Sequence, residues 1–246
     1  MPLEDLQPGE MQLIAATWNF RARAERSARL RFTRLAETLS EEGVPEQILT
    51  MAHTAIEDET RHIKLCDTLA ESFGWDRPIG PPTPHGAIGP TDGAPGDRLL
   101  FEMVAFCCVT ETINAAMLLE VRRIVEEPQI RETVQAILKD EVNHSKLGWA
   151  YLQHARNQGR GAFLPKWLPK MFYGAGVEEI YAEDNGSREA PHLAAYGELS
   201  FGRRTGIFRA SMRDIVLPGL ETMGVETMHG RQWLSEYEPT LATPTS

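Results

Sequence analysis

The five-residue pattern Asp-Glu-x-x-His occurs twice in the chain, at Asp58–His62 and at Asp140–His144. With this composition, one such match is expected by chance only about 0.03 times, so two matches are a strong signal. In an α-helix, a Glu and a His three residues later lie on one face about one turn apart, so both side chains can bind one metal centre. The alternative is two salt-bridged helix surfaces with exposed side chains, which would have no reason to repeat one pattern.

Two further glutamates lie where partner helices would complete such a site. Glu111 stands in an otherwise apolar stretch, where a charge on the inner face is unfavourable unless it is paired. Glu25 lies about 14 residues into the first predicted helix and, at about 1.5 Å per residue, reaches the same mid-height as the other glutamates. Glu37 is the alternative to Glu25, but it lies close to the end of that helix. The predicted metal ligands are Glu25, Glu59, His62, Glu111, Glu141 and His144.

This set of side chains indicates the chemistry of the site. Four carboxylates and two imidazoles suit two divalent ions of hard to borderline character. Four buried glutamates would repel one another, whereas two Fe(II) ions would neutralise them. Asp58 and Asp140 can each accept the free ring N–H of a metal-binding histidine across the helix pair. Arg61 can in turn hold one of these aspartates.

The elements that must position these residues are helices. Apolar residues recur at helical spacing on both sides of a central linker, and β-type alternation is nearly absent. Pro45 and Pro128 suit first helical turns, and Asp97 is a suitable N-cap residue. The pattern predicts an all-α fold with four long helical stretches, at about residues 11–42, 45–73, 97–127 and 128–159.

The central linker, residues 74–97, constrains how these stretches are connected. It contains six Gly and six Pro, so neither helix nor strand can persist there. In extended form it spans up to about 75 Å, which exceeds the roughly 45 Å length of a 30-residue helix. A four-helix bundle with one long crossover, the ferritin-like arrangement, uses such a linker. A flexible linker between two unrelated hairpins is the alternative, and it would leave an apolar face of each hairpin unburied.

The chain changes character after the fourth stretch. We predict a di-iron four-helix bundle over residues 1–160, a helical extension packed on it over 161–238, and a disordered tail over 239–246. In the extension, Pro165 and Pro169 interrupt an aromatic stretch, and Pro218 is expected to kink or end the last helix. The shorter helices are expected at about residues 176–184, 191–204 and 206–223.

Composition limits the classes of protein to consider. No run of about eighteen apolar residues is evident, so no membrane-spanning helix is expected. The N-terminus lacks the features of a signal peptide. A net charge of −10 does not favour binding to nucleic acid. Three cysteines are too few and odd in number for a disulfide framework, so a reduced, cytoplasmic protein is expected.

With these motifs, the chain resembles members of the ferritin-like superfamily of di-iron carboxylate proteins. The Asp-Glu-x-Arg-His form at Asp58–His62 is similar to the helix motif of bacterial multicomponent monooxygenase hydroxylases and related O₂-activating enzymes. The second copy has Asn143 where that family usually has Arg. The resemblance covers roughly residues 11–159. It implies reductive activation of O₂ at a di-iron(II) centre that the six predicted ligands hold.

The expected function is a di-iron oxygenase or oxidase that acts on a small, apolar or amphiphilic molecule, as a monomer or homodimer. Its electrons would come from a separate reductase, because no flavin or nicotinamide fingerprint is present. The alternative class is iron handling, as a ferritin-like ferroxidase, a storage subunit or a peroxide-scavenging relative. A bundle that uses Mn, mixed Mn/Fe or no metal is a third alternative.

Overall fold

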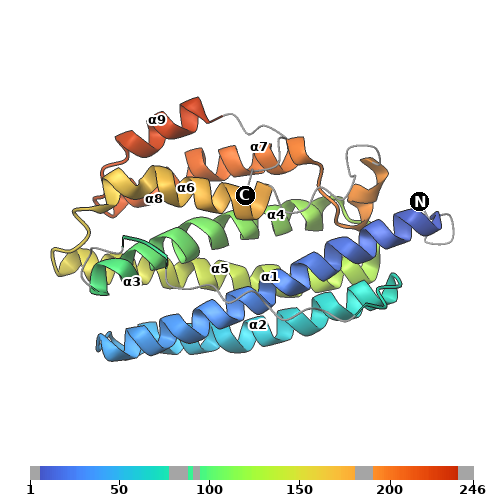
Figure 1. The fold of residues 1–246 in the computed structure, drawn as a ribbon, viewed down its shortest axis with the longest axis horizontal. Coiled ribbons are helices and arrows are strands. Elements are labelled where there is room, and N and C mark those ends of the chain that lie inside the picture. Colours follow the sequence, from blue (N-terminus) through green and yellow to red (C-terminus); the bar gives the residue numbers. More distant parts are fainter. Residues whose placement is uncertain (1–5, 78–87, 91–94, 181–190, 238–246) are drawn as a thin grey trace.

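The structure is a computed structural model that describes residues 6–77, 88–90, 95–180 and 191–237. All regular elements within these ranges are helices, and no strand is found in them. The prediction of an all-α protein is therefore confirmed. Figure 1 shows the long helices lying side by side, with shorter helices stacked on one face of the group.

Helices α1 (Pro8–Glu41) and α2 (Glu46–Ser72) form an antiparallel hairpin. Helix α1 begins three residues earlier than predicted, because Pro8 occupies the first turn and a capping box joins Gln7 and Glu10. The hairpin turns at Gly43, whose φ of +65° is a conformation that favours glycine. Both helices end as the sequence predicts, within a residue or two.

The third stretch differs from the prediction of one uninterrupted α-helix. It consists of α3 (Pro95–Met103), the π-helical segment η2 (Val104–Thr110) and α4 (Glu111–Ile124). Helix α3 begins at Pro95, so Asp97 lies in its first turn rather than at the N-cap. In η2 the bonding pattern widens, and the N–H of Glu111 donates to the carbonyl of Phe106, five residues back.

Helix α5 (Pro128–Asn157) packs against α2 on one side and against η2 and α4 on the other. In Figure 1, α2 ends near the N-terminus of the chain, whereas α3 begins at the opposite end of the group. The chain between them must therefore connect opposite ends, as the length of the linker allows. Most of the predicted crossover, residues 78–87 and 91–94, lies outside the described residues.

The stretch Gly96–Ile124 corrects one expectation from composition. It is long and apolar enough to pass as a membrane-spanning helix by length and composition, although none was expected. However, 72% of its most apolar window is buried inside the protein. Burial against neighbouring helices therefore accounts for its apolar character.

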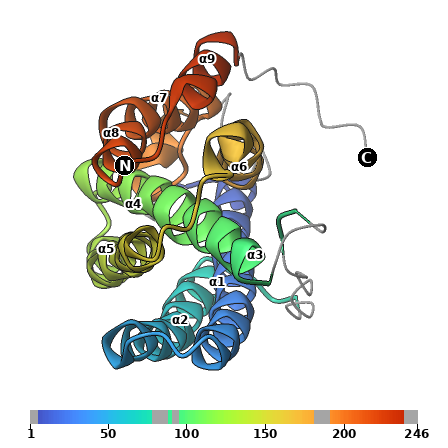
Figure 2. The ribbon, with the colours of Figure 1, turned by 90° about the vertical axis from the view of Figure 1, so that its left-hand side faces the viewer.

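The C-terminal helices lie on η2 and α4, on the side away from α2 (Figure 2). They differ from the predicted ranges. They are α6 (Leu164–Ile180), the 3₁₀ helix η3 (Pro191–Tyr196), α7 (Phe201–Ser211), the π-helical segment η4 (Met212–Val216), α8 (Leu217–Thr222) and α9 (Met228–Glu236).

Proline placement explains most of these differences. Pro165 lies in the first turn of α6, where its missing N–H costs nothing. Pro169 lies inside α6 and costs a helix hydrogen bond, but Leu168 and Phe172 beside it are fully buried. Pro218 does not end the helical run; it stands in the first turn of α8, directly after the π-helical segment η4. Helix α9 was not predicted, and the predicted tail at 239–246 lies outside the described residues.

Candidate metal centre

The six predicted ligands come together inside the helical group. They form two overlapping sets, and in each set the candidate ligand atoms lie within 4.8 Å of one another. Glu59 from α2 and Glu141 from α5 belong to both sets. The sets are Glu25, Glu59, His62 and Glu141, and Glu59, Glu111, Glu141 and His144. All six side chains are buried, and this arrangement can hold metal; that they are ligands stays a prediction.

Both imidazoles turn the same ring nitrogen toward the carboxylates. Nδ1 of His62 lies 3.5 Å from Oε1 of Glu141 and 3.6 Å from Oε2 of both Glu25 and Glu59. Nδ1 of His144 lies 3.1 Å from Oε2 of Glu141 and 3.2 Å from Oε1 of Glu59. The six side chains therefore face one common space.

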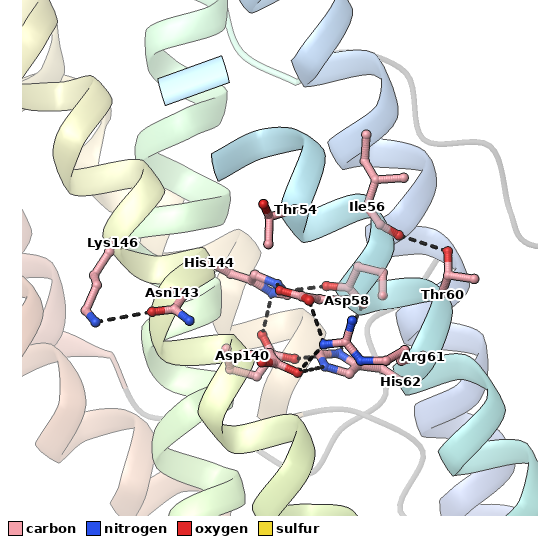
Figure 3. A network of polar contacts seen from close by, with 12 residues as sticks. Thr54, Ile56, Asp58, Thr60, Arg61, His62, Asp140, Asn143, His144 and Lys146 are labelled. Atoms are coloured by element: carbon pink, nitrogen blue, oxygen red, sulfur yellow. Dashed lines mark hydrogen bonds and ion pairs between the residues drawn. The ribbon is translucent and has the colours of Figure 1, made fainter. Parts of the chain in front are cut away.

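The other ring nitrogen of each histidine reaches an aspartate on the opposite helix. Nε2 of His62 lies 3.2 Å from Oδ2 of Asp140, and Nε2 of His144 lies 3.3 Å from Oδ2 of Asp58 (Figure 3). An Nε2–H donated to each aspartate leaves Nδ1 free as an electron-pair donor, which is the tautomer that a metal requires. The expected contacts across the helix pair are therefore present.

Arg61 ties the two aspartates together. Its Nη2 donates to Oδ1 of Asp58 at 2.6 Å and to Oδ2 of Asp140 at 2.8 Å (Figure 3). The sequence indicated a contact with one of them. Because half of the Arg61 side chain is exposed, this arginine links the buried cluster to the protein surface.

Glu111 enters the cluster directly after the π-helical segment η2. This segment packs against α5. A Cβ atom on Gly148 of α5 would lie 2.6 Å from Cβ of Cys107 and 2.7 Å from the backbone nitrogen of Cys108. Only a glycine therefore allows this approach. One turn away, the hydroxyls of Thr112 and Ser145 are hydrogen-bonded at 2.8 Å and join α4 to α5.

The metal-free cluster balances its charge with protons. Burial, and then the charge of a neighbouring glutamate, raises the pKa of Glu25 and of Glu111, so both favour the neutral form. Burial opposes charge on His62 too, but the facing carboxylates outweigh it and raise the pKa of His62 to about 11. They also raise the pKa of His144. Burial likewise acts against an ionised Glu59, yet the facing imidazoles lower the pKa of Glu59 to about 2.

Several buried atoms indicate that the cluster fits metal ions. Both carboxylate oxygens of Glu59, Oε1 of Glu141 and Nδ1 of His62 make no hydrogen bond of normal geometry to any residue that the structure describes. Buried polar atoms without partners are costly. All of them are hard to borderline donors of the kind that bind divalent ions. Burial raises the pKa of the Cys107 and Cys108 thiols, so these stay protonated core side chains rather than thiolate donors.

The structure also distinguishes Glu25 from Glu37, the two glutamates of α1 that the sequence offers as a possible ligand. Glu25 is 5% exposed and lies in the cluster, whereas Glu37 is exposed on the helix surface. Sequence reasoning missed η2 and the role of Gly148. A glycine inside a helical pattern is a signal of close packing, but the sequence does not say against which partner.

No protein-family model, no curated protein and no solved structure matches this chain significantly. Proposals about its function therefore depend on the geometry of the cluster itself.

Proposed function

We propose that the chain is a ferritin-like di-iron protein that activates O₂ to oxidise or hydroxylate a small organic molecule. One observation carries this proposal: Glu59 and Glu141 belong to both four-residue sets. Two carboxylates shared between two sets would suit a pair of neighbouring ions. The parallel course of α2 and α4 in Figure 1 supports the ferritin-like assignment, because a long crossover produces that direction.

In this proposal each ion has its own histidine and its own terminal carboxylate. Glu25 and His62 would hold one ion, and Glu111 and His144 would hold the other. Bound Fe(II) ions would supply the electrons and open coordination positions that reduction of O₂ requires. The protein would supply the electron-rich carboxylates that favour oxidation of the ions.

The surrounding residues hold the donors in place and exclude water. The contacts of His62 with Asp140 and of His144 with Asp58 fix each ring and make Nδ1 a stronger donor. The ring of Phe32 lies edge-on to the ring of His144, with centroids 5.0 Å apart, and closes that side with an apolar wall. A dry site strengthens the attraction between the carboxylates and the ions.

Metal analysis tests this proposal. Chain loaded anaerobically with Fe(II) and desalted should contain two iron atoms by mass spectrometry and develop an absorption transient when it meets O₂. Glu141→Ala should lose iron from one or both positions, since Glu141 is shared. Glu37→Ala, an exposed glutamate on α1, is the matched control and should keep two.

Three results would reject parts of the proposal. Full iron content in Glu141→Ala would show that the ions are held elsewhere. No iron after anaerobic loading would reject all di-iron functions together. Many iron atoms per chain, in a large assembly on size-exclusion chromatography, would indicate storage instead of oxygenation.

A further inference from the structure

A cavity of about 310 Å³ lies between α1, α3, η2 and α6, with residues 88–89 as a further wall. At the roughly 30 Å³ that a water molecule occupies in the liquid, this volume holds about ten non-hydrogen atoms. Protein interiors are normally close-packed, so unfilled space of this size is room for a ligand.

The inner wall of the cavity is apolar. The buried apolar side chains that form it are those of Phe101, Ala105, Met171 and Ala175. Ile88 adds another apolar side chain and is half-buried. These side chains offer van der Waals contact but no hydrogen bond, so they favour an apolar ligand.

The polar side chains of the inner wall are engaged within the protein. Oγ1 of Thr110 donates to the carbonyl of Ala105 at 3.2 Å. The guanidinium of Arg31 lies 4.6 Å from the centre of the Phe106 ring, and its Nε lies 3.9 Å from Oε1 of Glu102. The charge of Arg31 is therefore compensated before any ligand enters.

The remaining charged residue of the described lining is at the surface. Lys170 and Gly174 are exposed, so the cavity opens to solvent at this part of α6. Nζ of Lys170 lies 5.2 Å from the centre of the Trp167 ring, and its ammonium group can remain in water. An ion that entered the cavity would lose its own hydration, and the apolar wall offers it no hydrogen bond in return. A neutral molecule avoids this loss.

The cavity is distinct from the metal cluster, because none of the six candidate ligands lines it. A series of ring contacts lies between the two. The ring of Phe106, which Arg31 covers, lies 5.0 Å from the ring of Phe32, and this ring lies 5.0 Å from the ring of His144. A molecule in the cavity would contact η2, the segment that directly precedes Glu111.

We propose that this cavity binds an uncharged, predominantly apolar molecule of about ten non-hydrogen atoms, of the size of a substituted benzene. Its body would pack against Phe101, Met171 and Ala175, and the polar groups of the protein would keep their present partners. This binding does not require metal, so it stands apart from the proposed oxidation chemistry.

Three fluorinated benzenes of nearly equal shape and of about ten non-hydrogen atoms each test the inference, with binding to the full chain followed by fluorine NMR. The neutral probe is para-fluoroacetophenone, the anion is para-fluorobenzoate and the cation is para-fluorobenzamidinium. The neutral probe should bind about tenfold more tightly than either ion, because it enters without giving up the hydration of a charge. Metal-free and metal-loaded chain should behave alike.

Variants of the lining show whether the probe occupies this cavity. Ala175→Leu fills part of the space and should weaken binding of the neutral probe about tenfold or more. Ala150→Leu, at a half-buried alanine of α5 that does not line the cavity, is the matched control and should leave binding unchanged. Ala175→Val adds less volume and should give a smaller loss, which keeps the test if circular dichroism shows that Ala175→Leu does not fold.

Lys170→Met separates apolar contact from charge, because methionine keeps a long apolar side chain without the ammonium group. This variant should bind the neutral probe as the wild type does. Equal or tighter binding of an ion, equal effects of Ala175→Leu and Ala150→Leu, a large loss in Lys170→Met, or no saturable binding would overturn the inference. Glu141→Ala should still bind the neutral probe, so failure of the metal proposal and failure of this one give different results.

Discussion

Gly148→Ala tests whether the close approach of α5 to η2 positions the cluster of buried carboxylates and histidines. The added Cβ would meet Cβ of Cys107 at 2.6 Å and the backbone nitrogen of Cys108 at 2.7 Å. Neither neighbour is the free end of a flexible side chain, so α5 and η2 must move apart. Overpacking of this kind lowers the unfolding free energy by about 1–3 kcal/mol. The higher helix propensity of alanine relative to glycine raises it by about 1 kcal/mol. We expect a net loss of unfolding free energy of up to about 2 kcal/mol.

Urea unfolding, followed by circular dichroism, measures this loss of unfolding free energy. Metal analysis shows whether the movement of α5 and η2 also displaces the side chains of the cluster. Because η2 leads directly into Glu111, we expect the variant to bind less metal or to bind it more weakly. Gly206→Ala is the control: Gly206 lies inside α7 with nothing within 4 Å of an added Cβ, so it should gain about 0.5–1 kcal/mol. If Gly148→Ala were as stable as this control, the argument from close packing would be refuted.

Two further predictions concern the residues around the cluster. Arg61→Met removes the tie between Asp58 and Asp140 and should weaken metal binding about tenfold to a hundredfold, as measured by chelator competition. Lys64→Met, an exposed lysine on the same helix, is its control and should bind metal like the wild type. The second prediction concerns pH and the metal-free protein. Because the pKa of His62 is raised from 6.5 to about 11, its stabilisation is fully present below about pH 6.5 and is lost as pH rises through 11. The raised pKa of Glu25 acts in the same direction. The urea midpoint of the metal-free chain should therefore fall from pH 6.5 to 10, and bound metal should reduce the fall; a midpoint that rises without metal would contradict this.

The cluster was predictable because its signals are local in the sequence. A Glu and a His three residues apart are placed on one face by helix geometry alone, so the two motifs supply four of the six candidate ligands before any packing is known. Glu111 was found because a charge in an apolar stretch requires a partner. Glu25 was found only from its height along α1, and burial of Glu25 together with exposure of Glu37 decides between them.

The features that sequence reasoning missed depend on contacts between distant segments. The π-helical segment has no recognised residue pattern, and Gly148, which allows its close contact with α5, lies far from it in the sequence. The C-terminal helices were misplaced for a related reason. Proline was interpreted as a helix breaker, whereas burial of Leu168 and Phe172 stabilises α6 despite Pro169. Local patterns thus predict which residues meet more reliably than they predict the course of the backbone.

The crossed contacts between α2 and α5 have a consequence for how metal and fold depend on each other. Each histidine receives its orientation from the aspartate of the opposite helix, so neither motif is a complete half-site. Both sets of candidate ligands also share Glu59 and Glu141, one from each helix. Separation of α2 from α5 would therefore remove donors from both positions at once. If metal ions bind there as we propose, occupation of the two positions would be coupled to the packing of this one helix pair, and the free energy of metal binding would stabilise that packing directly.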